Sequence, residues 1–352
     1  MISKGRIIYV CANDGTDTRV VKELKTLSEK NEIIFIGCNK KSEDNFIENY
    51  VNRKFIFKSS HRNPVTYLLF NVVIVFLRLR YRCTSIHIVD EQTFLFVWLS
   101  CLFKPVTLDI FDSIFLKYNL PNDKGLMLKR LLYGLSENII VTDQKRKNLL
   151  PVEFQRKSVI LPNVPFRVCH LDEKVRLCKG NVVRFGCFGT LTEDRGISFL
   201  SQIVKLSPKV EITCAGWIPR AETRRTIENS ISFKFLGILQ QHDVFKVMQE
   251  TDFLCMIYPS NNLNNQYASP NKLYDAIHLG IPVICNDDME VAKYVDQYKL
   301  GITLSRREIE HPDQSVVDKI MNFVPLSVSI YEELKVLHCW ENFEEELINC
   351  HS

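Results

Sequence analysis

The sequence predicts an α/β protein made of two similar units, each with a parallel sheet covered by helices on both faces. Short apolar strand segments alternate with helical segments along the chain, which is typical of parallel sheets. The alternation stops once, at Pro162-Asn163-Val164-Pro165, and then starts again. A chain of 352 residues is long for one hydrophobic core and suits two.

The first unit is expected to span residues 1–165, because two prolines around an Asn make a stiff, extended connection. A helix is expected at Asp17–Lys30, where apolar residues recur at helical spacing, and another from Thr142 to Leu150. The expected strands are Arg6–Cys11, Glu32–Ile36, Ser85–Val89, Val106–Ile110, Asn138–Val141 and Val159–Leu161.

The second unit is expected at residues 166–326, followed at 327–352 by a C-terminal helix that packs back toward the first unit. This last helix is drawn from Ser329 to Cys350, where large apolar side chains recur on one side. The other expected elements are strands at Val182–Phe188, Val210–Ala215, Ile231–Phe235, Phe253–Ile257 and Ile281–Cys285, with helices at Arg195–Leu206 and His242–Gln249.

Composition narrows the classes of function. A net charge of +4 is too small to indicate nucleic acid as the main partner. The twelve Cys residues show neither C-x-x-C pairs nor zinc spacing, which indicates buried free thiols in a reducing compartment. No secretory signal is recognisable, and the longest apolar run, Val65–Leu77, is shorter than the ~20 residues of a spanning helix. We therefore expect a cytoplasmic location.

A helix after residue 268 carries the strongest chemical signal. Ser269 is expected as its N-cap and Pro270 as its first residue, while Gly280 is expected to end it. Lys272 and Asp275, three residues apart, share one side of this helix. The helix start offers free N–H groups to a phosphate beside the Lys272 ammonium, and Asp275 could bind a ribose diol. A surface Lys–Asp pair is the alternative interpretation.

A glycine turn supports the same interpretation. Gly189 follows a predicted strand, where a residue without a side chain lets a ligand approach the backbone. Arg195 stands at the start of the next helix, and its guanidinium suits phosphate oxygens. The motif is weak alone, but it belongs to the same unit as Lys272.

The motifs G-T-L-x-x-D-R-G-I, C-A-G-W, F-K-F-L-G-I-L, D-F-L-C-M-I-Y-P and S-P-N-K-L-Y-D-A-I-H-L-G-I-P-V-I resemble the donor domain of GT-B glycosyltransferases. They are most similar to family-4-like enzymes of bacterial surface polysaccharides. The resemblance extends to the first half through D-T-R-V-V-K-E-L, I-I-V-T-D and V-I-L-P-N-V-P. It implies two facing Rossmann-like domains with a cleft between them, the acceptor in the first and a nucleotide sugar in the second.

The resemblance also implies roles for individual residues. Asp275 matches the ribose-binding end of the family's E-x7-E motif, whereas Tyr267 replaces its first Glu. Thr190 and Arg195 stand where the family has its two pyrophosphate-binding cations, and Lys272 is expected to replace the lost charge. The implied donor-binding residues are Gly189, Thr190, Arg195, Gly216, Leu236, Gly237, Leu239, Asn264, Asn265, Ser269, Asn271, Lys272 and Asp275.

Acidic residues follow three predicted strands of the first unit and are candidates for the acceptor site. The acidic candidates are Asp14, Asp17, Asp90, Glu91 and Asp112, and Gly15 belongs to the same loop as the first two. Carboxylates at the carboxyl edge of a sheet could orient or deprotonate an acceptor hydroxyl. Helix capping is the alternative, especially for Asp17 and Asp112. Glu91, Asp112, Arg195 and Lys272 are the expected catalytic residues. No metal or cofactor is expected, since fixed cations and a helix dipole can neutralise a leaving diphosphate.

The segment from Asn49 to Val89 contains no Asp or Glu. A helix over Val65–Leu77 flanked by cations could lie on an anionic bilayer, and a buried core helix is the alternative. The cations of this segment are Arg53, Lys54, Lys58, Arg62, Arg78, Arg80 and Arg82.

These observations predict a retaining, metal-independent glycosyltransferase. The donor is expected to be a nucleotide diphosphate sugar, UDP rather than GDP, and the acceptor a lipid-linked or growing glycan of O-antigen, capsule or exopolysaccharide type. A polyprenyl diphosphate would carry that acceptor at the inner face of the cytoplasmic membrane. A GT-B epimerase and a non-catalytic nucleotide-sugar or glycan-binding subunit are the alternatives. A dinucleotide oxidoreductase lacks its G-x-G-x-x-G after the first strand.

Overall fold

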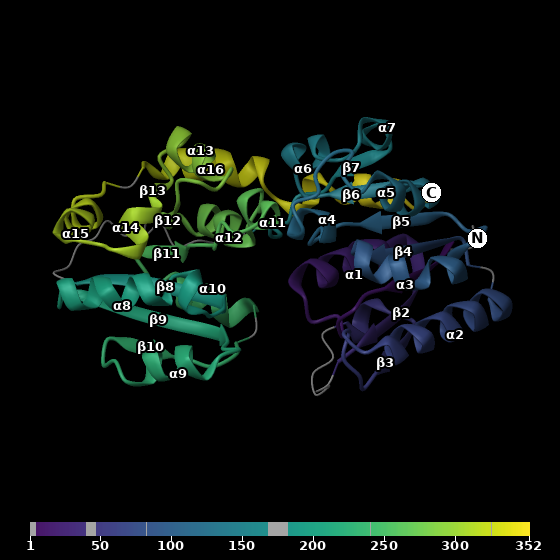
Figure 1. Ribbon diagram of the computed structural model, residues 1–352, viewed down its shortest axis with the longest axis horizontal. Helices are drawn as coiled ribbons and strands as arrows, with labels where there is room; N and C mark the ends of the chain where they lie inside the picture. Colours follow the sequence, from purple (N-terminus) through teal and green to yellow (C-terminus); the bar gives the residue numbers. More distant parts are fainter. Residues whose placement is uncertain (1–4, 40–46, 82, 168–181, 240, 325) are drawn as a thin grey trace. The chain divides into compact units, whose positions relative to one another are not determined.

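Two parallel sheets, of seven and six strands, organise the chain (Figure 1). The computed structural model describes residues 5–39, 47–81, 83–167, 182–239, 241–324 and 326–352. Unit 1 consists of Met1–Pro162 with Trp340–Ser352, and unit 2 of Asn163–Cys339. The unit boundary thus falls inside the proline-rich connection.

The sheet of unit 1 has the order β3-β2-β1-β4-β5-β6-β7. All strands are parallel. Strands β1 to β3 are added toward one edge of the sheet, and β4 to β7 toward the other. Right-handed crossovers therefore put the helix after β1 and the helix after β4 on opposite faces. The strands are β1 (Gly5–Val10), β2 (Asn31–Cys38), β3 (Arg53–Phe57), β4 (Ser85–Val89), β5 (Val106–Asp109), β6 (Asn138–Val141) and β7 (Ser158–Ile160).

One face of this sheet is covered by α2, α3 and α5, and α1 packs with α17 on the other. The first face is apolar, with Ile8, Ile88 and Leu108 packed against the inner sides of α2 and α3. The helices of unit 1 are α1 (Thr18–Lys30), η1 (Glu48–Tyr50), α2 (Pro64–Arg80), α3 (Glu91–Cys101), α4 (Ile114–Lys117), α5 (Leu126–Leu135), α6 (Gln144–Asn148), α7 (Val152–Gln155), η3 (Trp340–Asn342) and α17 (Glu344–Asn349).

The sheet of unit 2 has the order β10-β9-β8-β11-β12-β13. Strands β8 to β10 are added toward one edge and β11 to β13 toward the other, so the strand order reverses between β8 and β11. Its strands are β8 (Val183–Thr190), β9 (Val210–Trp217), β10 (Phe233–Phe235), β11 (Phe253–Met256), β12 (Val283–Asn286) and β13 (Gly301–Leu304). Its helices are η2 (Glu193–Arg195), α8 (Ile197–Leu206), α9 (Ala221–Glu228), α10 (Gln241–Met248), α11 (Leu263–Gln266), α12 (Asn271–Leu279), α13 (Ala292–Gln297), α14 (Arg306–Glu310), α15 (Gln314–Met321) and α16 (Val328–Leu337).

The C-terminal segment is not the single helix expected from Ser329 to Cys350. Helix α16 ends at Leu337, its C-cap His338 leaves helical geometry, and α16 packs on α12 within unit 2. The chain resumes as η3 and α17 in unit 1, where the fully buried Trp340 donates its indole N–H to Thr26 Oγ1 at 2.9 Å. The helix breaks because its two halves bury their apolar side chains in different units.

None of the helices in the described part of the chain combines the length and apolarity needed to cross a bilayer. Helix α2, the most apolar candidate in the sequence, has 17 residues.

All ten cysteines in the described part of the chain are buried and free, as expected.

Candidate functional site: the carboxyl edge of the second sheet

The carboxyl ends of β8 and β11 meet where the strand order of unit 2 reverses. In open parallel sheets, ligands bind at this kind of switch point, because the following loops diverge to opposite faces and leave the strand ends open. Gly189 and Thr190 end β8, and Tyr258 follows β11. The loop after β8 leads into η2 with Arg195, and the loop after β11 leads through α11 to α12 with Lys272.

Glycines bring the strand ends unusually close together. The N–H of Gly216 donates to the carbonyl of Gly237 at 2.7 Å. A Cβ atom on Gly216 would lie 1.8 Å from the carbonyl oxygen of Gly189, and its φ of +140° disfavours any side chain. Gly189 has a φ of +89°. A Cβ atom built on Gly189 would face open space, and its one neighbour within 4 Å among the described residues would be Lys272 Cε, at 4.0 Å. This arrangement keeps the backbone bare beside the Lys272 side chain.

Two cations converge beside this bare backbone. Arg195 Cζ lies 4.8 Å, and Lys272 Nζ 5.7 Å, from the ring centroid of Tyr258. Both side chains are half-buried, and within the described part of the chain neither forms an ion pair with a carboxylate. Asn286 anchors Tyr258, accepting from its N–H at 2.9 Å and donating to its carbonyl at 2.8 Å. Two uncompensated positive charges near one ring suit a dianionic ligand such as a diphosphate.

The helix with Lys272 begins later than expected. Pro270, not Ser269, is the N-cap, and α12 starts at Asn271. Ser269 Oγ instead lies 2.9 Å from the hydroxyl of Tyr274, so its side chain does not cap the first turn. No side chain in the described part of the chain caps the start of α12, and Leu273 N–H donates to the Pro270 carbonyl at 3.0 Å, so an anion would meet the N–H groups that precede Leu273. The predicted C-cap is confirmed: Gly280 has φ of +64° in the left-handed region.

The remaining predicted donor residues lie around the same sheet edge. Asn265 Nδ2 donates to the carbonyl of Pro259 at 2.7 Å, so its amide helps to shape the Asn-rich loop. Asn264 is buried, and Leu236 and Leu239 pack on the apolar cluster beside α12. Thr190, Gly237, Asn271 and Asp275 are half-buried. Ligand contacts of all these residues stay predictions.

The acceptor candidates of unit 1 lie at the carboxyl ends of β1, β4 and β5. Asp17 is the N-cap of α1 and accepts from Arg19 N–H at 2.9 Å, so the capping alternative holds for it. Asp14 accepts from the Thr16 hydroxyl at 2.7 Å and from the Asn39 amide. Gly15, with φ of +87°, packs under Ile47. This loop is therefore held by contacts of its own and by Asn39 and Ile47 from outside it.

Glu91 is fully buried and already engaged. It accepts from Ile114 N–H at 2.7 Å, from Ser113 Oγ at 3.0 Å and from the Tyr133 hydroxyl. These bonds hold the start of α4, a positioning role that its sequence context alone did not indicate. Burial raises the pKa of Glu91 above its ordinary value. Its expected catalytic role stays a prediction.

Asp90 has the most unusual environment of the acidic candidates. Its φ is +65°, a strained value for a residue with a side chain. Its Oδ1 accepts from the N–H groups of Phe111 at 2.9 Å and Asp112 at 3.0 Å. Burial and then the nearby Asp112 charge raise the pKa of Asp90 to about 7. Asp112 is exposed and lies 3.7 Å from Lys117, while Ser113, not Asp112, caps α4.

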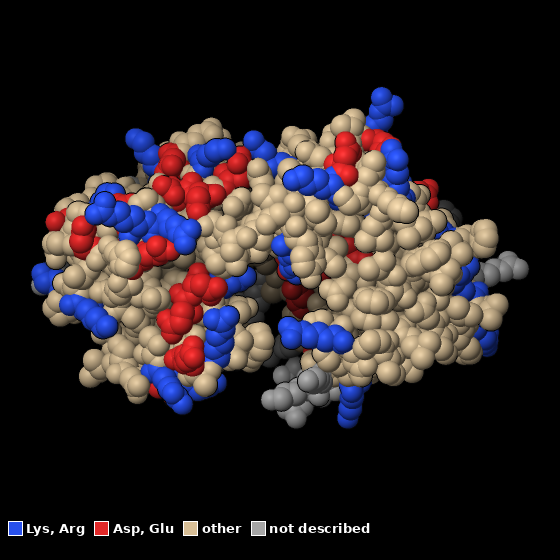
Figure 2. Space-filling model, in the orientation of Figure 1, with Lys and Arg blue, Asp and Glu red and all other residues tan. Residues whose placement is uncertain are grey.

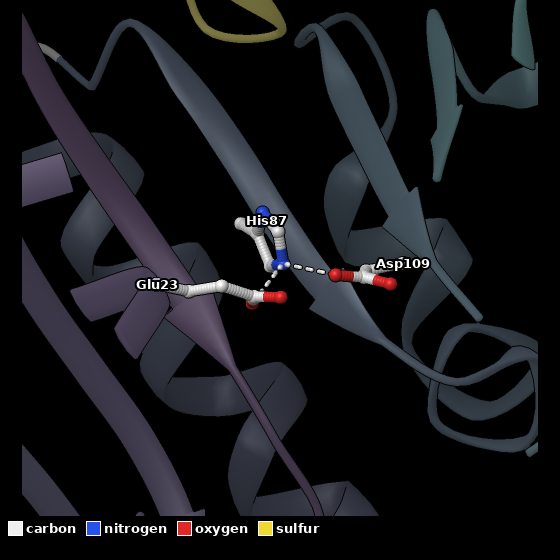
Figure 3. Close-up of side chains that lie close together, drawn as sticks. All are labelled: Glu23, His87 and Asp109. Carbon is white, nitrogen blue, oxygen red and sulfur yellow. Dashed lines mark ion pairs between the residues drawn. The ribbon is translucent and has the colours of Figure 1, made fainter. Parts of the chain in front are cut away.

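The other face of the unit 1 sheet carries a buried polar network that sequence reasoning missed. Glu23, His87 and Asp109 converge there from α1, β4 and β5 (Figure 3). Arg19 donates to Glu23 at 2.8 Å, to both oxygens of Asp109 at 2.8 and 2.9 Å, and to the carbonyl of Leu161 at 2.8 Å. The i, i+4 spacing of Arg19 and Glu23 among apolar helix positions was the available signal.

This network has the donor types of a metal site, but Arg19 already supplies its positive charge. Burial raises the pKa of Asp109 well above its ordinary value, whereas Arg19 and His87 outweigh burial at Glu23 and lower the pKa of that carboxyl. The Arg19 guanidinium contacts both carboxyls and is their shared counter-charge. His87 also lies 3.1 Å from His351, which links the C-terminus to the network. We assign the group a structural role.

Solved structures similar to this chain include glycosyltransferases. Sucrose-phosphate synthase from Thermosynechococcus elongatus matches with a TM-score of 0.72 and 13% identity, covering 98% of this chain and 97% of the other. Anabaena HepE in complex with UDP and glucose matches at 0.70 and 12%, with 98% of both chains covered. The lipopolysaccharide outer core galactosyltransferase WaaB matches at 0.64 and 12%, again with 98% of both covered.

No protein-family model matches the chain, and no curated protein is similar enough in sequence to count as a match. Identities of 12 and 13% establish the fold alone. The predicted GT-B fold, with two parallel-sheet α/β domains, is confirmed.

Replacing Gly216 by Ala should destabilise unit 2 by about 3 kcal/mol or more, because the methyl group meets the Gly189 backbone and the φ is strained. Gly134→Ala is the matched control, since nothing lies within 4 Å of a Cβ there and Ala favours the helix. Urea unfolding measures both. Equal free energies of unfolding for the two variants would rule out the close approach.

Replacing Arg19 by Met should destabilise unit 1 by about 3–5 kcal/mol, because two buried carboxyls lose their counter-charge. Arg6→Met breaks the more exposed pair with Glu32 and should cost at most about 1 kcal/mol. Chemical denaturation at neutral pH compares them. A cost for Arg19→Met no larger than for Arg6→Met would contradict the network.

Asp90 should make stability depend on pH between about 4 and 7. Its folded-state pKa of about 7 exceeds the ordinary 3.8, so the folded protein holds the proton more tightly. This contribution is fully present below pH 3.8 and is lost as the pH rises to 7. Asp90→Asn should remove that slope from unfolding free energies measured across this range. An unchanged slope in the variant would show that Asp90 does not titrate there.

Proposed function

We propose that the chain is a glycosyltransferase that takes a sugar from a nucleotide diphosphate sugar bound to unit 2. One observation carries this proposal: Arg195 and Lys272 converge on Tyr258 next to the bare Gly189 backbone. A diphosphate leaving group gains negative charge as the glycosidic bond breaks, and cations already in position stabilise that charge without rearranging. The N-terminus of α12 adds dipole charge of the same sign.

We propose UDP as the nucleotide. The solved structure of HepE is a complex with UDP and glucose. A second similar structure, of an Escherichia coli protein, contains UDP-2-fluoro glucose and matches this chain with a TM-score of 0.65 and 10% identity. Asp275 and the backbone around Leu236–Leu239 would bind the ribose and base. Membership of the family-4-like group and a retaining outcome belong to the same proposal.

The acceptor is proposed to be a lipid-linked or growing surface glycan bound by unit 1. The carboxyl ends of β1, β4 and β5 offer Asp14, Asp90 and Asp112 to its hydroxyls. Of these, Asp90 combines backbone strain with a pKa raised to about 7, which suits a group that exchanges a proton near neutral pH. A polyprenyl diphosphate carrier would place the protein at the inner face of the cytoplasmic membrane.

UDP should raise the melting temperature of the wild-type chain, and Lys272→Ala should weaken UDP binding about tenfold or more. A charge-assisted hydrogen bond contributes about 1.5–3 kcal/mol, and 1.4 kcal/mol corresponds to tenfold in affinity. Thermal shift across a UDP series measures the change. Lys293→Ala, which removes an exposed Lys paired with Glu290 elsewhere in unit 2, is the matched control.

The proposal fails if UDP does not raise the melting temperature of the wild type, or if it raises the melting temperatures of Lys272→Ala and Lys293→Ala equally. With UDP binding established, incubation with UDP-sugars separates the activities: transfer to an added acceptor, or slow release of free sugar to water, supports a glycosyltransferase. Interconversion of the donor sugar with no acceptor would instead indicate an epimerase.

A further inference from the structure

The outer side of α2 in unit 1 is as apolar as its inner side. Thr66, Tyr67, Phe70, Ile74 and Leu77 face the core. The opposite side repeats at helical spacing and stays exposed. Its large side chains are Val65, Leu68, Val72, Val75, Phe76 and Leu79, with Leu79 exposed to 84%. A surface helix normally carries polar residues on its outer side, so this side needs another explanation.

Helix α3 extends this apolar surface. Asn71 donates to the carbonyl of Phe96 at 2.9 Å, and Arg78 donates to the carbonyl of Leu102 at 2.6 Å, which holds α2 and α3 side by side. Phe96 and Leu99 face outward from α3. Phe103, just beyond, is 96% exposed at a φ of +64°, a strained value that presents its ring to solvent. We call the exposed side chains of α2 and α3 with Phe103 the outer apolar face.

Cations lie near both ends of the helix α2 that forms much of the outer apolar face. The guanidinium groups of Arg6, Arg53 and Arg80 lie 5.1, 5.0 and 5.3 Å from the ring centroid of Tyr81, at the C-terminal end of α2. Only Arg6 of these three has a carboxylate partner, Glu32, within the described part of the chain. Lys58 and Arg62 are exposed near the other end of the helix. Arg82 lies outside the described residues. Figure 2 shows a broad tan expanse over α2 and α3 with blue side chains at its edges.

We propose that the outer apolar face docks on the surface of an anionic lipid bilayer, with the α2 axis in the plane of the membrane. The apolar side chains enter the acyl boundary, and Arg53, Arg80 and Arg62 bind anionic headgroups. Helix α2 has 17 residues and its inner side is committed to the core, so it lies on the bilayer and does not cross it.

A second copy of this chain fits the face less well. In a two-fold symmetric contact the same patch meets itself, so the cations of one copy would face those of the other. Residues 49–89 contain no carboxylate that could compensate them. Anionic headgroups supply the missing negative charge, which is why the charge pattern favours a membrane.

This inference extends the proposed lipid-linked acceptor, but its test needs no sugar donor. Wild-type protein is sedimented with vesicles of phosphatidylcholine alone or with 30% phosphatidylglycerol. We expect binding to the anionic vesicles, weakened at least tenfold by 0.5 M salt. The variant Val72→Ser, Phe76→Ser, Phe103→Ser should lose at least tenfold in partitioning. Since all three side chains are exposed, the variant should fold normally.

A matched control changes three exposed apolar residues of unit 2, Ile231, Val324 and Val336, to Ser, and should bind vesicles as the wild type does. Arg53→Ala with Arg80→Ala should reduce binding to anionic vesicles only. The inference is overturned if the wild type stays in the supernatant, if the unit 1 variant binds normally, or if phosphatidylglycerol has no effect. Dimerisation abolished by the unit 1 variant, without vesicle binding, would identify a second copy instead.

The melting shift caused by UDP separates the two proposals. The unit 1 variant should lose vesicle binding and keep the shift, whereas Lys272→Ala should lose the shift and keep vesicle binding. Loss of both properties in either variant would contradict the independence of the two surfaces.

Discussion

The close approach of two strand ends in unit 2 is the constraint on which the proposed donor site depends. The Gly189 carbonyl lies so close to Gly216 that no side chain fits between them, so the ends of β8 and β9 present backbone without side chains at these two positions. The Lys272 side chain lies beside Gly189 and near the Tyr258 ring, and Arg195, from the loop after β8, lies near the same ring. The proposed affinity for an anion rests on this geometry, because it brings together two positive charges that have no carboxylate partner among the described residues.

Unit 1 divides its work between the two faces of one sheet. Apolar side chains fill the face under α2 and α3, while the other face holds Arg19 with its two buried carboxyls. The network also binds both ends of the unit: Arg19 reaches the carbonyl of Leu161 before the connection, and His87 contacts His351 near the C-terminus. Polar groups thus hold the point where the chain leaves unit 1 and the point near its C-terminus, while the helices on the apolar face present an outer surface.

Patterns local in the sequence predicted most of the fold. The strand Ser85–Val89 was placed at its observed bounds, and the glycine ending α12 was identified, because both depend on neighbouring residues. The edge strands β3 and β13 were missed: β3 opens with two cations, Arg53 and Lys54, and gains its place by pairing with β2. The start of α12 moved by one residue because Ser269 bonds to Tyr274 instead of capping. Tyr258, Arg19 and His87 act through contacts distant in sequence, which no local pattern reveals.

A crystal structure of the chain with UDP tests the central claim most directly. The account predicts the diphosphate within hydrogen-bonding distance of Lys272 Nζ and the Arg195 guanidinium, over Gly189 and at the N-terminus of α12. UDP bound at another place, or bound here with its diphosphate turned away from both cations, would contradict it.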